Sequence, residues 1–313
     1  MGYTRRLLWF IAALNFEVTT NAILYSFGEL FAGERAWSKG MQSLELSGRS
    51  FDLKYPEMGP DMCHCNFLDP HGFLTILHHV LQMHVGAVFL AACPCFSWIF
   101  MTSHTTGRDR HVLGNDRPWV LAQNALVSRI VYVLILCMKR GVYWIVEQPR
   151  SSRLFEHPRW LYMIKRYPCI EVAEPDMGVH TLDVEKASVL AGTAPYLKSM
   201  GRRLTAFGKE LVRSNPNRKV TTTSYIDSTG KRRSVGAADL KGTEAYSMGF
   251  GLHHAKLYEE MCQHHVTANL PGHPLVAPDP DSDSEIGDAG EECFEDFKHG
   301  FEHFELEPPH RRK

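Results

Sequence analysis

Residues 88–98 read Val-Phe-Leu-Ala-Ala-Cys-Pro-Cys-Phe-Ser-Trp, an apolar run that stops abruptly at a Cys-Pro-Cys turn. Five consecutive apolar residues bounded by a turn are typical of a strand buried on both faces of a sheet. In open α/β sheets, ligands bind in the crevice outside the carboxyl ends of the strands. The stretch therefore predicts a buried strand that carries a cysteine towards a ligand site.

Strand-like and helix-like segments alternate around this run. Apolar runs bounded by turns predict strands at 23–31, 50–53, 86–92 and 143–146. Apolar periodicity and end signals predict helices at 70–84 and between Asp116 and Gly141, a short helix near 35–40, and a polar loop at 99–115. The alternation predicts an α/β fold, a Rossmann-like three-layer sandwich with a mostly parallel central sheet.

The signals weaken after residue 150. We expect a strand near 189–191, a hairpin that pairs 220–226 with 231–235, and a closing helix at 253–264. From residue 271 onward Pro, Asp, Ser and Glu dominate, which is typical of a disordered acidic tail. The expected organisation is an apolar N-terminal segment (1–20), one α/β domain (21–265) and the disordered acidic tail (266–313).

The net charge of −1 is the sum of a basic body and an acidic C-terminal segment. Residues 277–313 hold 12 acidic and 4 basic residues, which leaves 23 acidic and 30 basic residues in 1–276, a net charge of +7. A basic body suits a polyanionic partner, because neutralisation of phosphates drives non-specific affinity for nucleic acids. A solvated charged surface explains the same numbers, and the sequence leaves the oligomeric state open.

The N-terminus and the cysteines bear on localisation. Arg5 and Arg6 precede the apolar run 7–14, which has the shape of a signal peptide but lacks a clear cleavage site. We favour an N-terminal helix, with secretion as the alternative. The eight cysteines lack the spacing of a disulfide framework, which favours an intracellular protein of the nucleus or cytoplasm. The apolar run 130–138 is too short to span a bilayer, so no stable membrane insertion is expected.

The first strand ends in a turn that suits a nucleotide. Glu29, Phe31, Ala32 and Gly33 form this candidate cofactor-binding turn, where a small residue lets the backbone approach a ligand. Asp52 follows Gly33 by 19 residues, at the end of the next strand, where a carboxylate accepts hydrogen bonds from ribose hydroxyls. An ordinary βα turn is the alternative reading of these residues.

Two further strand ends carry reactive groups. Pro94 stiffens the turn that presents Cys95, and a nucleophilic cysteine needs a lowered pKa and partial exposure. Arg108 and Arg110 of the following loop are candidates for supplying positive potential, and with Pro94 and Ser97 they form a candidate substrate loop. Glu147 ends a later strand, where its carboxylate can hold a ring nitrogen of a base. An inert buried cysteine and a salt-bridged surface glutamate are the alternatives.

The order Phe-Ala-Gly, Pro-Cys and Glu-Gln-Pro resembles the motif order of C5-cytosine DNA methyltransferases, and the chain looks like a divergent branch of that family. The resemblance covers about residues 22–150. It implies S-adenosyl-L-methionine as cofactor, DNA or RNA as partner, and methyl transfer to C5 of cytosine. It places the cofactor at Phe31, Ala32 and Gly33, the ribose at Asp52 and the adenine at Asn66. It makes Cys95 the nucleophile and Glu147 the contact to the base.

The chain also departs from the family pattern. Glu34, Arg35 and Ala36 follow Gly33 where the family continues with glycine, Gln148 replaces the asparagine after the glutamate, and no Gln-x-Arg-x-Arg motif is present. The alternative function is therefore a catalytically inactive protein of the same fold that binds nucleic acid or cofactor.

Two other clusters of residues are weaker candidates for a functional site. Cys63-His64-Cys65 offers metal-ligand residue types without a second pair, so a zinc site is the less favoured reading. The other cluster is a possible phosphate-binding face, or a solvated charged one, and consists of Arg202, Arg203, Lys209, Arg213, Arg218, Lys219, Lys231, Arg232 and Arg233.

Overall fold

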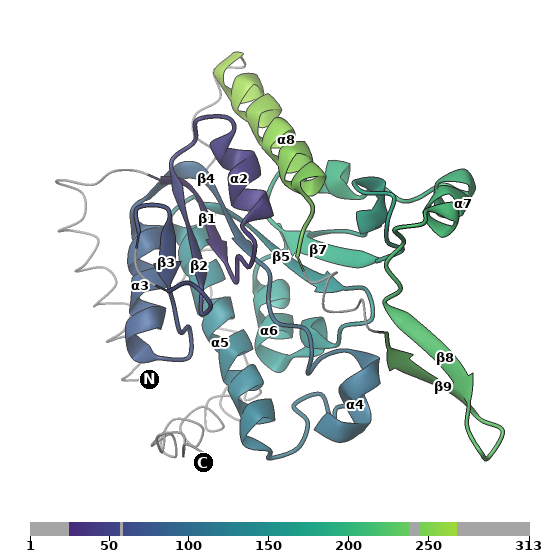
Figure 1. Ribbon diagram of the computed structural model, residues 1–313. Coiled ribbons are helices and arrows are strands. Elements are labelled where there is room, and N and C mark those ends of the chain that lie inside the picture. Colours follow the sequence, from purple (N-terminus) through teal and green to yellow (C-terminus); the bar gives the residue numbers. More distant parts are fainter. Residues whose placement is uncertain (1–24, 57–58, 238–244, 268–313) are drawn as a thin grey trace.

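A computed structural model describes residues 25–56, 59–237 and 245–267. The expected N-terminal segment (1–20) lies outside the described residues. Of the expected tail, only residues 266 and 267 are described. In this part of the chain, seven strands form one sheet in the order β3-β2-β1-β4-β5-β7-β6 (Figure 1). The strands are β1 (Tyr25–Leu30), β2 (Gly48–Asp52), β3 (Met62–His64), β4 (Met83–Ala91), β5 (Tyr143–Pro149), β6 (Glu171–Ala173) and β7 (Ser188–Gly192).

The sheet is mostly parallel. Strands β1 to β5 all run the same way, and β7 is antiparallel to both of its neighbours, β5 and β6. The first five strands follow the doubly wound order 3-2-1-4-5, in which the strand order reverses between β1 and β4. The predicted α/β, Rossmann-like fold is therefore confirmed, and the carboxyl ends of β1 to β5 meet at one edge.

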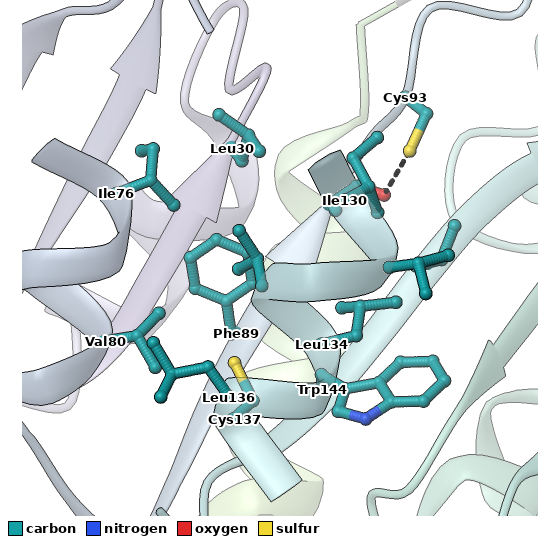
Figure 2. Close-up of a cluster of buried hydrophobic side chains, with 14 of the residues drawn as sticks. Leu30, Ile76, Val80, Phe89, Cys93, Ile130, Leu134, Leu136, Cys137 and Trp144 are labelled. Atoms are coloured by element: carbon teal, nitrogen blue, oxygen red, sulfur yellow. Dashed lines mark hydrogen bonds between the residues drawn. The ribbon is translucent and has the colours of Figure 1, made fainter. Parts of the chain in front are cut away.

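Helices cover both faces of the sheet (Figure 1). The α-helices are α2 (Ala36–Gln42), α3 (Pro70–Leu81), α4 (Phe100–Thr106), α5 (Pro118–Lys139), α6 (Pro158–Arg166), α7 (Ala206–Ser214) and α8 (Met248–Thr267), with 3₁₀ turns at η1 (Leu154–Glu156), η2 (Met177–Val179) and η3 (Leu197–Met200). On one face, Phe89 and Trp144 pack against Ile130 and Leu134 of α5 (Figure 2). On the other face, α2 and α8 cover Phe27 and Ile145.

Two glycines allow α2 and α8 to cross closely. A Cβ atom on Gly40 would lie 2.3 Å from the backbone of Gly251, and one on Gly251 would lie 2.2 Å from the carbonyl oxygen of Ala36. Any side chain at these positions would push the helices apart. The crossing brings the start of α8, and with it Tyr246, over the carboxyl edge of the sheet.

The structure corrects one expectation about the middle of the chain and shows a second feature there. Helix α4 occupies part of the expected polar loop at 99–115, because Thr102, Ser103 and Thr106 bond their hydroxyls to carbonyls three or four residues back within the turn. Helix α5 is 22 residues long, and an 18-residue window within it has a mean hydropathy of 1.9, so among the described helices it alone has the length and apolarity of a membrane span. In this fold α5 is a core helix, with 56% of that window buried.

Candidate functional site at the carboxyl edge

The candidate site residues lie at the ends of five adjacent strands. In the spatial order of the sheet they are Asn66 after β3, Asp52 on β2, Gly33 after β1, Cys95 after β4 and Glu147 on β5. Strands lie about 5 Å apart, so the five positions span about 20 Å. We name residues 31–35, Asp52 and Asn66 the cofactor half of the edge, and residues 93–98 with Glu147 and Gln148 the thiol half.

The turn after β1 has an unusual backbone. Phe31, Gly33 and Arg35 have φ angles of 61°, 52° and 61°, in the left-handed region that non-glycine residues rarely adopt. The Gly33 N–H donates to Asp52 Oδ2 at 2.8 Å, and the Tyr55 hydroxyl donates to the Gly33 carbonyl at 3.1 Å. A strained turn held by specific partners is a common feature of ligand sites.

The cofactor half has room and acceptors for a nucleoside. A Cβ atom added to Gly33 would meet no atom within 4 Å, so that side of the turn is open. Asp52 is half-buried, and Oδ1 accepts from the Lys54 N–H at 2.9 Å. A carboxylate has about four lone-pair sites, so Asp52 keeps acceptor capacity for hydroxyl groups. These two observations fit a ribose placed over the turn.

Glu29 faces the helix after the turn. Its side chain is fully buried, and Oε2 accepts from the backbone N–H of Ser38 at 3.0 Å and from the Ser38 hydroxyl. Oε1 has no hydrogen-bond partner among the described residues. Burial raises the pKa of this carboxyl to about 7, against the lowering effect of the Ser38 bonds. Glu29 thus satisfies an N–H of the first turn of α2, and its free oxygen is the part left for a ligand.

Asn66 lies at the far end of the cofactor half. Its side chain is exposed, and Oδ1 accepts from the Leu68 N–H at 3.2 Å, in the turn that leads into α3. Phe31 packs edge-on against Phe67, with ring centroids 5.7 Å apart. An exposed amide beside aromatic rings suits recognition of a base edge.

The two cysteines of the Cys-Pro-Cys turn have different environments. Cys93 is 4% exposed, and its Sγ lies in the apolar core within 3.8 Å of the Ala91 carbonyl (Figure 2). Burial, with the nearby Glu147 charge, raises the pKa of the Cys93 thiol far above its usual value. Cys95 is half-exposed. Because a nucleophilic thiol must be accessible and must ionise, Cys95 is the better candidate.

Contacts from β5 and the following segment fix the thiol half. The Gln148 side-chain amide donates to the Cys93 carbonyl at 2.6 Å, and the Arg153 N–H donates to the Trp98 carbonyl at 2.9 Å. Within the turn, the Trp98 N–H donates to the Cys95 carbonyl at 2.8 Å. The position of Cys95 therefore depends on residues more than fifty positions away in sequence.

Arg108 and Ser97 lie inside the protein instead of in an exposed substrate loop. The Arg108 guanidinium lies 3.4 Å from the ring centroid of buried Trp98 and donates to Asn124 at 2.9 Å, to Ser97 at 3.4 Å and to the Val112 carbonyl. Burial, with the charge of Arg153, lowers the pKa of Arg108 to about 10. Arg110 is exposed on the turn after α4. Arg108 thus braces the loop, because its planar cation packs against an aromatic ring.

Glu147 is a buried carboxylate at the tip of β5. It is 5% exposed, and Oε2 accepts from the Tyr246 hydroxyl at 3.2 Å. Oε1 is buried and has no hydrogen-bond partner among the described residues. Buried polar atoms in native proteins normally have partners, so this oxygen has room for a donor that the described residues do not supply.

Tyr246 is a site residue that the sequence reasoning missed. It comes from the segment before α8, 99 residues after Glu147. Burial and the charges of Glu147 and Glu29 raise the pKa of its phenol well above the usual value, so it stays a hydrogen-bond donor. No local sequence signal connects Tyr246 to a strand end so far away, and only the crossing of α2 and α8 brings it there.

The Cys63-His64-Cys65 cluster and the basic cluster show fewer features of a ligand site. Cys63 and Cys65 are buried in the core, where burial raises the pKa of Cys65 to about 12, and no group of three potential metal ligands occurs in the described residues. In the basic set, several members form ion pairs with acidic neighbours; these pairs are Arg203–Glu174, Arg213–Glu185, Arg218–Glu185 and Lys219–Asp183.

The comparisons with known proteins add little beyond the geometry. No family model and no curated protein matches the chain. A crystal structure of a triple mutant of Spodoptera frugiperda DNMT2 is similar over 55% of this chain and 50% of that chain, at 13% identity and a TM-score of 0.30. The chain therefore spans half the length of that structure, and the fold assignment rests on the strand order and directions.

Proposed function

We propose that this protein transfers the methyl group of S-adenosyl-L-methionine to C5 of cytosine in DNA or RNA, with Cys95 as nucleophile. The observation that carries the proposal is the buried Oε1 of Glu147, which has no partner among the described residues, next to a turn that presents a half-exposed thiol. The exocyclic amine of a cytosine is the kind of donor that such an oxygen lacks, and a proton on the carboxyl group would bridge to the N3 acceptor beside it. The motif resemblance to C5-cytosine methyltransferases supports the same assignment.

The chemistry assigns one task to each residue. The Cys95 thiolate attacks C6 of the ring and forms a carbon–sulfur bond, which moves an electron pair towards C5. Glu147 holds the base at N3 and at the amine, and a proton shared with N3 stabilises the charge that develops there. C5 takes up the methyl group, and loss of the C5 proton to solvent then expels the Cys95 thiolate. In a duplex, the base must first leave the stack.

The cofactor half suits S-adenosyl-L-methionine. Asp52 would accept from the ribose hydroxyls, and Asn66 would contact the adenine. The cofactor supplies a methyl group on a positively charged sulfur, and this charge suits an edge that carries the carboxyl groups of Asp52 and Glu147. Gly33, open on one side, leaves room for the cofactor to approach the backbone.

A covalent trap tests the proposal. DNA or RNA that contains 5-fluorocytosine, incubated with the protein and the cofactor, should give a methylated adduct that survives denaturation, because fluorine cannot leave as the C5 proton does. Cys95→Ala should give none. Cys169→Ala removes an exposed cysteine far from the edge and should leave the adduct yield unchanged. No adduct with either nucleic acid contradicts the proposal.

A second candidate is an inactive protein that binds the cofactor. The Asp52–Gly33 hydrogen bond and the open turn favour it, because neither depends on the thiol. This candidate predicts that calorimetry detects S-adenosyl-L-methionine binding to the wild type and none to Asp52→Ala. It also predicts that the wild type forms no adduct with 5-fluorocytosine nucleic acid. Both candidates propose a protein of the nucleus or cytoplasm, and an intact N-terminus after expression in a eukaryotic cell would support that.

A further inference from the structure

A two-stranded hairpin stands apart from the seven-stranded sheet (Figure 1). Its strands are β8 (Thr222–Ile226) and β9 (Arg232–Gly236), paired antiparallel. All five residues of β8 are exposed, with Tyr225 at 52% and Ile226 at 73%. Neither hydrophobic core includes a residue of β8 or β9. An isolated hairpin with two wet faces gains little stability of its own, so folding gives no reason for apolar side chains here.

The hairpin is strongly basic. Residues 217–236 hold five basic residues (Arg218, Lys219, Lys231, Arg232, Arg233) and one acidic residue, Asp227, for a net charge of +4. The acidic neighbours Glu185 and Asp183 pair with Arg218 and Lys219 at the base. Asp227 accepts from the Thr229 and Lys231 N–H groups of the turn. Lys231 and Arg232 are exposed near the tip, so positive charge increases away from the body.

The hairpin lies next to the thiol half of the edge. Strand β9 contacts α4, the helix that begins two residues after Trp98. The Thr102 hydroxyl of α4 donates to the Phe96 carbonyl at 2.5 Å, so α4 and the Cys95 turn form one unit. A polyanion bound along the hairpin would pass close to Cys95.

From these observations we propose that the β8–β9 hairpin binds duplex DNA in its major groove, with Lys231 and Arg232 on the phosphates and Tyr225 towards the bases. A two-stranded ribbon fits the wide major groove of B-form DNA, whereas the major groove of duplex RNA is too deep and narrow. This inference rests on the proposed function for its link to methyl transfer, and it names duplex DNA as the substrate class.

The test measures binding without cofactor. A labelled duplex of about 20 base pairs, two helical turns, is titrated with the wild type and with the double variant Lys231→Ala/Arg232→Ala at several salt concentrations. Loss of two phosphate contacts should lower the slope of log affinity against log salt by about 2, and weaken binding near 0.1 M salt at least ~10-fold. Lys165→Ala/Lys256→Ala is the matched control, since it removes two exposed charges from α6 and α8.

Each outcome decides the hairpin assignment. Equal affinity and slope in the double variant and the wild type overturn it. So does equal binding of duplex RNA or single-stranded DNA, if the double variant weakens that binding too. Concentration-dependent self-association that the double variant abolishes also overturns it, in favour of a second copy of the chain. Weaker duplex-DNA binding in the double variant alone, with an unchanged melting temperature, supports it.

The adduct assay separates this inference from the proposed function. If wild-type protein binds DNA through the hairpin but forms no adduct with 5-fluorocytosine DNA, the proposed function fails and the hairpin assignment stands. If the adduct forms equally well in the double variant at low DNA concentration, the hairpin assignment fails alone.

Discussion

The cofactor half and the thiol half of the carboxyl edge are held in place by different means. In the cofactor half, three residues with positive φ and backbone N–H groups to Asp52 shape the turn, and the contacts join neighbouring strands. In the thiol half, side chains of Arg108, Gln148 and Tyr246 hold the turn and Glu147, and the last two bond across 55 and 99 residues of sequence. The first half is a local backbone device, whereas the second depends on long-range packing.

This difference predicts which property, stability or ligand affinity, a substitution in each half changes most. A substitution in the thiol half removes a buried polar partner, so it lowers the stability of the whole domain along with the geometry at Cys95. A substitution in the cofactor half changes an open turn, so it should affect ligand affinity more than stability. Four measurements test this contrast between the two halves of the edge.

The largest effect is expected for Arg108→Ala. The variant loses a cation stacked on Trp98 and leaves the acceptors on Val112 and Asn124 without their donor. Because hydrogen bonds from a charged group are worth about 1.5–3 kcal/mol, the free energy of unfolding should fall by about 3 kcal/mol in urea denaturation. Exposed Arg110→Ala should change it by less than ~0.5 kcal/mol. Equal losses in both variants would contradict the bracing role of Arg108.

The next effect is a pH dependence that arises from Glu29. The folded state holds its pKa at about 7, above the value of 4.5 for a free glutamate, so the folded state binds the proton more tightly. The stability that this group contributes is therefore complete below about pH 4.5, falls as pH rises to about 7, and is level above that, with a total change of roughly 3 kcal/mol.

Unfolding of Glu29→Gln at pH 5 and pH 8 measures this effect. Relative to the wild type, the variant should gain roughly 2 kcal/mol between the two pH values, because it has no proton to lose. The exposed acid Glu259→Gln on α8 serves as control and should show no such gain. A pH profile of Glu29→Gln parallel to that of the wild type would rule out the buried carboxylic acid.

Gln148→Ala should cost about 1–2 kcal/mol. It leaves the buried Cys93 carbonyl without its 2.6 Å donor, and a buried unsatisfied acceptor carries its desolvation penalty. The thiol turn should also lose its fixed position, so the yield of the 5-fluorocytosine adduct should fall more than the folded fraction does. An adduct yield that simply follows the folded fraction would mean that Gln148 stabilises without positioning.

Gly33→Ala should have the smallest effect on stability, about 1 kcal/mol. Its φ of 52° is strained for alanine, but no atom of the protein lies within 4 Å of the new methyl group. Gly230→Ala, at a φ of 78° and equally open, is a matched control at the hairpin tip. Calorimetry should show weaker S-adenosyl-L-methionine binding only for Gly33→Ala, because only there does a ligand need the space.

Local sequence signals predicted the parallel strands and most of the helices on which the edge depends. The run 88–92, the turn at Gly33 and the proline at 118 each fix a local conformation that does not depend on distant residues. Local sequence patterns did not predict the role of a residue where that role depends on its packing partner. Arg108 has the sequence context of an exposed loop, yet it packs on Trp98, and α4 forms in a stretch with few apolar residues.

Sequence patterns alone predicted that the chain alternates strands and helices, and that a thiol, a carboxylate and a small-residue turn follow three of the strands. Only the tertiary structure decided the spatial order Asn66, Asp52, Gly33, Cys95, Glu147, which differs from the order in the chain. It also decided that Tyr246 meets Glu147 and that the hairpin stands beside the Cys95 turn. Strand order and helix crossings come from long-range packing, for which no local stretch of sequence carries a signal.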